Sequence, residues 1–335
     1  MKINRKELID VLKSVEAGLD TRELLKNTQS FMFAGTRVHT YNDMVSVSAD
    51  LPKGVELTGS VKATEMLHLL SKTPDEVVDL SMEAAELLLT TPKSRAGIVR
   101  EAEVPNYMEH MGMPETWIPI PDGLMAAVTM CHFSCSHDCS KPLLNNVLIR
   151  GKQVVSSDDF RITVQAIKEG LGSDDVLIPS SLVRDISNHS PVEYGVTPGW
   201  NHLRNNGGAV FSFRALDGKY ADVNKFLKFD GKALHMPEGL AEGVGRAKEV
   251  LDPKASSQLV TLAVKGGTLL MSAKGPFAWF KERYKVATSD ELTFNINPDF
   301  LISALQHDPK FVVGERALRI EGADFTHIVL LIVIR

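Results

Sequence analysis

The chain has 335 residues, and 44% of them are hydrophobic, which is enough material for more than one buried core. Its formal net charge of −5 excludes a globally basic protein, although a basic surface within an acidic protein would escape this count. The longest apolar run, residues 328–334, is far shorter than the roughly twenty residues of a membrane helix, and the N-terminus contains no apolar signal core. We therefore expect a cytoplasmic protein, without a membrane partner, whose three cysteines are reduced.

The first elements along the chain are a helix, a hairpin and a second helix. A helical pattern covers residues 7–15, and two apolar runs separated by a glycine indicate a hairpin at residues 31–40. Residues 61–74 begin as a strand end, continue with apolar residues at helical spacing, and finish at Pro74, which stops the helix.

The same order of elements recurs twice, with a period of about 116 residues. Two later segments, 178–191 and 296–309, repeat the pattern of a β-branched residue, a helical stretch and a closing proline. In the last segment Asn297 is a favoured helix cap, and Pro298 is a favoured first helical residue. Other landmarks keep the period: first helices open at Leu8, Leu124 and Leu240, and hairpins turn at Gly35, Gly151 and Gly266.

A repeat of this length indicates three similar domains rather than a stack of small units. Because each copy contains both helices and hairpins, we expect an α+β fold. The domain boundaries predicted from the landmarks are 1–116, 117–228 and 229–335.

Over essentially its whole length the chain resembles the bacterial-type sliding clamp family, the beta subunit of DNA polymerase III. In the first domain the likeness lies in VKATEMLHLLSKTPDEVVDLSMEAAELLLTTPKSRAGI and in the closing element EVPNYMEH. Three later segments are similar to the family's RPxLNGVLF, VATDGHRLAV and GRFPDY motifs, namely SHDCSKPLLNNVLI, VVSSDDFRITV and LDGKYADVNKFL. The chain departs from the family where Asp159 and Phe160 replace Gly-His, where Ala221 replaces a proline, and at the C-terminal IVLLIVIR, which lacks a proline.

The resemblance implies three tandem clamp-type domains, each with two helices packed on antiparallel sheets, which together form half of a ring. Two chains would close the ring head to tail as a homodimer around duplex DNA. The protein would be a non-enzymatic processivity factor that tethers a DNA polymerase, and a clamp loader would open it. The resemblance implies no cofactor, and the sequence contains no P-loop, dinucleotide-binding, nucleophile-elbow or metalloprotease motif.

The resemblance also implies three sets of contact residues. Inward-facing cations would centre the duplex through weak, salt-sensitive contacts that read no bases, and they are Lys13, Arg22, Lys26, Lys62, Lys72, Arg184, Arg246, Lys248 and Lys254. The dimer interface is expected at Leu70, Tyr107, Val250 and Leu251. A cleft between domains 2 and 3 would accept a short extended peptide with hydrophobic anchors, and its expected residues are Leu144, Ser157, Phe160, Arg161, Ile162, Lys225, Phe226, Leu331, Ile332, Val333 and Ile334. We hypothesise that Phe160 fills part of this cleft and changes which peptide fits.

All three cysteines lie in one stretch, CHFSCSHDCSKP, at residues 131–142. Cys131, Cys135 and Cys139, with His132 or His137, have the ligand types of a zinc site, but structural sites mostly use tighter cysteine pairs. The matching stretches of the other two copies contain no such cluster, so the fold does not need one. We therefore expect no metal, a half-buried Cys131 and two loop thiols.

Two other interpretations stay open. One is a clamp-derived binding hub that does not encircle DNA, and the other is a zinc- or thiol-dependent protein built around the three cysteines. The carboxylate pair Asp158–Asp159 is interpreted as a polar turn between strands rather than as a catalytic pair.

Overall fold

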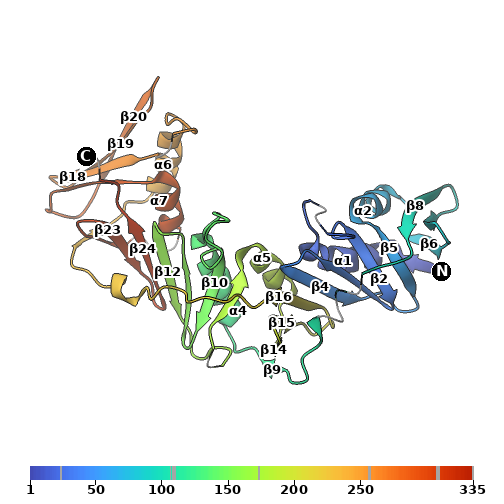
Figure 1. Cartoon of the computed structure of the whole chain (residues 1–335). Helices are drawn as coiled ribbons and strands as arrows, with labels where there is room; N and C mark the ends of the chain where they lie inside the picture. The colour runs from blue at the N-terminus through green and yellow to red at the C-terminus, as the bar shows by residue number, and fades with distance from the viewer. Residues whose placement is uncertain are drawn as a thin grey trace. The chain divides into compact units, whose positions relative to one another are not determined.

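A computed structural model describes residues 1–22, 25–105, 107, 111–172, 174–255, 258–306 and 310–333 (Figure 1). The chain forms two compact units, and each combines stretches that are distant in the sequence. The first unit contains Met1–Thr129 and Glu169–Gly218, and the second contains Met130–Lys168 and Lys219–Arg335. None of the helices in the described residues is long and apolar enough to cross a membrane.

The first unit is built on one long antiparallel sheet with the order β1-β6-β7-β8-β5-β2-β3-β4-β16-β15-β14-β9. Its elements are β1 (Lys2–Asn4), α1 (Arg5–Ser14), η1 (Glu16–Gly18), β2 (Ser30–Gly35), β3 (Arg37–Tyr41), β4 (Val45–Asp50), β5 (Leu57–Lys62), α2 (Ala63–Lys72), β6 (Val77–Met82), β7 (Glu86–Thr90), β8 (Arg95–Glu101), β9 (Ile118–Pro119), α4 (Leu124–Cys131, which runs on into the second unit), β13 (Val176–Pro179), α5 (Ser180–His189), β14 (Glu193–Thr197), β15 (Trp200–Arg204) and β16 (Val210–Arg214).

Two antiparallel sheets organise the second unit. One runs β10-β11-β12-β24-β23-β22-β17, and the other runs β20-β19-β18-β21. The elements are η2 (His132–Ser134), β10 (Asn146–Arg150), β11 (Gln153–Ser157), β12 (Arg161–Ala166), η3 (Asn224–Phe226), β17 (Lys232–His235), α6 (Leu240–Lys248), β18 (Val260–Lys265), β19 (Thr268–Lys274), β20 (Trp279–Lys285), β21 (Leu292–Ile296), α7 (Pro298–Leu305), β22 (Lys310–Val313), β23 (Ala317–Glu321) and β24 (Phe325–Leu330).

The repeat predicted from the sequence is present. Each copy has a first helix (α1, α4 or α6), a hairpin (β2-β3, β10-β11 or β18-β19) and a second helix (α2, α5 or α7). The three predicted hairpin glycines, Gly35, Gly151 and Gly266, all have positive φ, a conformation that side chains disfavour. The α+β class with antiparallel sheets is thus confirmed.

Amphipathic helices cover the sheets and supply the core. In the first unit, α1 buries Leu8 and Leu12, and α2 buries Met66 and Leu70. In the second unit α6 and α7 lie side by side (Figure 1), α6 packs on β18, β19 and β20, and the buried leucines of the two helices, Leu240 and Leu301, join one cluster. Each fully buried leucine contributes about 1.5–3 kcal/mol relative to an exposed one.

Strand pairing joins the repeats within each unit. In the first unit β4 of the first repeat pairs with β16 of the second, with Val47 opposite Phe211. In the second unit β12 of the second repeat pairs with β24 of the third, with Ile162 opposite Ile328. The second repeat therefore contributes strands to both units.

The sequence predicts that Asn297 caps α7, and its side-chain oxygen accepts hydrogen bonds from the backbone N–H groups of Asp299 (2.9 Å) and Phe300 (3.3 Å). We expect Asn297→Ala to lower the free energy of unfolding by about 1 kcal/mol, because two helix N–H groups lose their acceptor. Asn297→Asp keeps an acceptor and should be nearly neutral. Urea denaturation measures both, and equal losses in the two variants would contradict the capping role.

Candidate functional site

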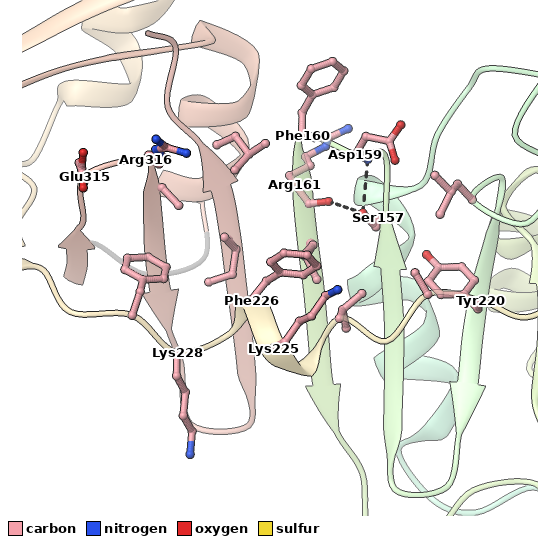
Figure 2. A pocket seen from close by; sticks show the side chains of 18 of the residues that line it. Ser157, Asp159, Phe160, Arg161, Tyr220, Lys225, Phe226, Lys228, Glu315 and Arg316 are labelled. Carbon is pink, nitrogen blue, oxygen red and sulfur yellow. Dashed lines mark hydrogen bonds between the residues drawn. The ribbon is translucent and has the colours of Figure 1, made fainter.

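A groove of about 650 Å³ opens on the second unit (Figure 2). Strands β11, β12 and β24 provide its floor, the segment around η3 crosses it, and the turn before β23 closes one side. The residues that line it are Leu144, Ser157, Asp159, Phe160, Arg161, Ile162, Tyr220, Ala221, Val223, Lys225, Phe226, Lys228, Phe229, Asp230, Glu315, Arg316, Ala317, Ile328 and Leu330.

The floor of the groove is apolar because two adjacent strands place isoleucines opposite each other. Ile162 of β12 pairs with Ile328 of β24, and both side chains line the groove. Tyr220 is 1% exposed, and burial raises the pKa of its hydroxyl, so the ring remains a neutral part of the wall. Phe226 is 51% exposed and lies over the strands, where a ligand could cover it (Figure 2).

Arg161 is held inside the wall. Its Nε lies 2.8 Å from Asp158 Oδ2, and both side chains are almost buried, at 11% and 13% exposure. The guanidinium also stacks over the ring of Phe300, 4.5 Å from the centroid. Asp158 Oδ1 accepts the backbone N–H groups of Phe160 and Arg161, which completes the pairing of this buried charge. Arg161 therefore acts mainly as a structural member of the groove.

The turn between β11 and β12 determines where Phe160 stands. Ser157 Oγ donates to the carbonyl of Arg161 at 2.9 Å, and Asp159 adopts a left-handed backbone with φ of 75°. Aspartate tolerates this conformation better than most residues do, and its carboxylate also pairs with Lys141. Phe160 then stands at one end of the groove, 59% exposed and pointing outward (Figure 2).

The rim of the groove carries both signs of charge. Lys225 lies with its Nζ 4.9 Å from the centroid of the Phe226 ring. Lys228 and Arg316 add cations, whereas acids are supplied by Asp230 and Glu315. The rim can therefore pair with charges of either sign, and the floor offers an apolar surface for contact.

Seven of the predicted cleft residues line this groove: Leu144, Ser157, Phe160, Arg161, Ile162, Lys225 and Phe226. Leu331, Ile332 and Val333 do not line it: β24 ends at Leu330, and the backbone N–H of Leu331 donates to the carbonyl of Arg316. The backbone N–H of Ile332 donates to the carbonyl of Asn295 in β21 instead, and Val333 is exposed. Ile334 lies outside the described residues. The sequence analysis missed Leu330 and the turn that carries Arg316.

The predicted DNA-facing cations are distributed over both units. Lys13, Lys62, Lys72, Arg184, Arg246 and Lys248 lie on or next to helices, whereas loops carry Arg22, Lys26 and Lys254. Acids engage Lys26 (Glu101, 3.4 Å), Arg246 (Glu282, 2.8 Å) and Lys248 (Asp299, 2.5 Å). In the described helices seven lysines and arginines face six acids, so the helices carry little net positive charge.

The predicted interface residues need correction. Leu70 is fully buried in the core beneath α2, so it has no surface to offer a partner, and that prediction is wrong. Tyr107 stacks on Tyr41 with ring centroids 4.1 Å apart, inside a cluster of the first unit. Val250 and Leu251 are partly buried against the core of the second unit.

The strands that do offer surface at a sheet edge were missed by the sequence analysis. Strand β20 is the edge of its sheet and exposes Trp279. Strand β8 pairs with β5 only through its last two residues, and Val99 is 74% exposed.

The cysteine cluster is more buried than expected. Cys131 is buried, so the expected half-buried state is wrong; Cys135 and Cys139 lie in the loop after η2 as expected, Cys135 buried and Cys139 exposed. Burial raises the pKa of Cys131, and it raises the pKa of Cys135 to about 12. Within the described part of the chain, no group of three histidine, cysteine or acidic side chains is arranged to hold a metal ion.

The fold is that of bacterial sliding clamps. A DnaN sliding clamp (DNA polymerase III subunit beta) from Pseudomonas aeruginosa bound to griselimycin has a TM-score of 0.83 and 16% identity, with 100% of this chain and 99% of that chain covered. The beta chains of Streptococcus pneumoniae (19% identity) and Caulobacter crescentus (15%) also have TM-scores of 0.83, with 99% of both chains covered. No protein-family model and no curated protein matches the sequence. The resemblance found in the sequence is thus confirmed at the level of the fold.

The burial of two thiols predicts their reactivity. With a thiol reagent at pH 8 we expect Cys139 to react rapidly in the folded protein, and Cys131 and Cys135 to react only after denaturation. The raised pKa values keep these two groups as unreactive thiols at that pH. Cys139→Ser should remove the fast reaction. Near-stoichiometric zinc that survives dialysis, together with protection of Cys139, would contradict this assignment.

Proposed function

We propose that the protein is a DNA sliding clamp, a non-enzymatic processivity factor that works in the cytoplasm. The observation that carries the proposal is the likeness to sliding clamps over the whole chain, at a TM-score of 0.83. The apolar groove supports it, because a tethering protein needs a surface that binds its partner protein without catalysing a reaction.

The ring would consist of two chains, each contributing three domains at residues 1–116, 117–228 and 229–335. A head-to-tail dimer joins two different edges of the molecule. We infer that β20 of one chain meets β8 of the other, because both strands leave backbone groups at a sheet edge, and strand addition would satisfy them. Val250 and Leu251 would lie close to this junction, since Gly275, in the turn before β20, packs against the backbone of Val250.

The hold on DNA would be topological rather than adhesive. The helices carry almost balanced charge, so they would repel the duplex little and attract it weakly. Exposed cations such as Lys13 and Arg184 would centre the duplex through contacts with phosphates, which do not depend on the base sequence. Weak contacts suit a tether that must slide.

The groove would bind short peptides of a DNA polymerase and of a clamp loader. Its floor of Ile162, Ile328 and Leu330 suits hydrophobic anchors, and its mixed rim suits a peptide with charges of both signs. Phe160 and Phe226 would flank the anchors and influence which side chain fits.

A second candidate is a clamp-derived hub that binds proteins through the groove but does not encircle DNA. The balanced charge of the helices agrees with it as well, because a hub needs no contact with DNA. The two candidates differ in their oligomeric state and in their behaviour on circular DNA.

The first test is retention on DNA circles. Loaded by its cognate clamp loader, the protein should remain on a closed circle through gel filtration at high salt, and it should run off when the circle is cut. High salt removes charge contacts but not topological linkage. Sedimentation of the protein alone should show a dimer. A monomer that is lost equally from closed and cut circles would support the hub instead.

The second test measures peptide affinity at the groove. We expect Phe226→Ala to weaken binding of a client polymerase tail peptide about tenfold, because an exposed aromatic that is covered on binding is a typical hot spot. Phe160→His should also shift the affinity. Val196→Ala, a change at an exposed apolar residue of the first unit, is the matched control and should have no effect. Equal affinities of the Phe160→His variant and the unchanged protein would count against a role for Phe160.

A further inference from the structure

Strand β20 separates its side chains into two chemically different faces. Phe280, Glu282 and Tyr284 point toward α6, where Arg246 donates to both oxygens of Glu282 at 2.8 and 2.9 Å. The alternate residues point outward and are exposed, and they are Trp279, Lys281, Arg283 and Lys285. The acid of this strand is thus satisfied on the inner face, and the outer face carries only cations and an aromatic ring.

The strand register extends this basic face across the sheet. Lys274 of β19 lies opposite Trp279, and Lys265 of β18 lies opposite Thr268, which itself faces Lys285. Five cations therefore point the same way: Lys265, Lys274, Lys281, Arg283 and Lys285. Among the described residues only Lys265 of this set has an acidic partner, Glu291 at 3.6 Å. In a chain with a net charge of −5 this is an unusual concentration of positive charge.

Aromatic rings and a hollow accompany the cations. Phe277, in the turn between β19 and β20, is 99% exposed, and Trp279 is 68% exposed. Trp279 forms one wall of a hollow of about 720 Å³, which Lys274 and Lys281 border together with the hydroxyl side chains of Thr261 and Ser272. Asp252 also lines the hollow, and its carboxylate accepts the backbone N–H of Lys254. The β19-β20 hairpin extends past α6, which leaves this end of the sheet open (Figure 1).

We propose that this outward face of β18, β19 and β20 binds single-stranded nucleic acid. Outward side chains along a strand are about 7 Å apart, comparable to neighbouring phosphates of an extended single strand, so Lys281, Arg283 and Lys285 can pair with successive phosphates. A base stacks on Trp279 and enters the hollow, where the hydroxyl of Ser272 meets its polar edge; the hydroxyl of Thr261 already donates to Asn295 Oδ1 at 2.7 Å.

The exposed rings favour a single strand over a duplex. In a duplex the faces of the bases are stacked on one another, so neither Phe277 nor Trp279 would gain a partner. The site does not depend on ring closure. Strand addition at β20 uses the backbone groups in the plane of the sheet, whereas the proposed contacts use side chains that point out of it.

The proposal can be tested by fluorescence anisotropy with a labelled oligothymidylate and with a duplex of the same length. We expect the single strand to bind more tightly and Trp279→Ala to weaken its binding about tenfold, with Trp279→Phe largely restoring it. Lys281→Gln and Lys285→Gln should each reduce the slope of log affinity against log salt by about 0.7, because one phosphate contact is lost. Lys53→Gln and Lys93→Gln, at exposed turns of the first unit, are matched controls and should leave the slope unchanged.

Three outcomes would overturn the proposal. The first is equal binding of single strand and duplex, and the second is an unchanged salt slope in Lys281→Gln and Lys285→Gln. The third is a loss of dimer in sedimentation with Trp279→Ala while oligothymidylate binding persists, since the face would then be a contact between copies. All of the substituted side chains are exposed, so the variants should fold, and circular dichroism checks this.

Discussion

The pairing of β12 with β24 is the constraint on which the candidate groove depends. Five residue pairs, from Arg161 opposite Val329 to Gln165 opposite Phe325, join a strand of the second repeat to one of the third. Each repeat alone would leave a strand edge with unpaired N–H and C=O groups, which is costly when buried and prone to aggregation when exposed. Joining the copies removes two edges and at the same time sets Ile162 beside Ile328. The groove floor is therefore a consequence of the strand pairing that joins the two repeats.

The helices and the outward face of one sheet differ in their charge. The helices carry nearly equal numbers of bases and acids, and several of these are paired with each other or with the sheet, as Arg246 is with Glu282. The outward face of β18, β19 and β20 carries cations with almost no acids nearby. The net charge of −5 shows neither fact, because it sums one basic face with the acidic residues of the rest of the chain. In this protein, local register tells more about binding than total charge does.

The fold could be predicted from the sequence where the signals are local. Asn297 caps a helix through its own side chain, and Gly151 permits a turn through its own φ. Each feature can therefore be recognised from one residue in the sequence. Ser157, Phe160, Arg161 and Ile162 were expected in the groove because their stretch resembles one family motif. Arg316 lies in the turn between β22 and β23 and reaches the groove only because β23 pairs with β24, which nothing in its sequence neighbours indicates. The family resemblance implied that Leu70 and Ile332 are contact residues, but a resemblance in sequence does not state against which surface an apolar side chain packs.

The contacts of Arg161 explain how the groove can keep its form while its specificity varies. Its guanidinium is bound to Asp158 and lies over Phe300 and Phe133, which come from different repeats. A charge pair this buried is stable only when both partners keep their hydrogen bonds, so a ligand gains little by competing for it. In the proposed function, selection among ligands would then rest on exposed groups, above all Phe160, together with Phe226, Lys228 and Arg316 at the rim. The departures from the family motifs at Asp159 and Phe160 lie in the exposed turn, where side chains can change without loss of the wall that Arg161 maintains.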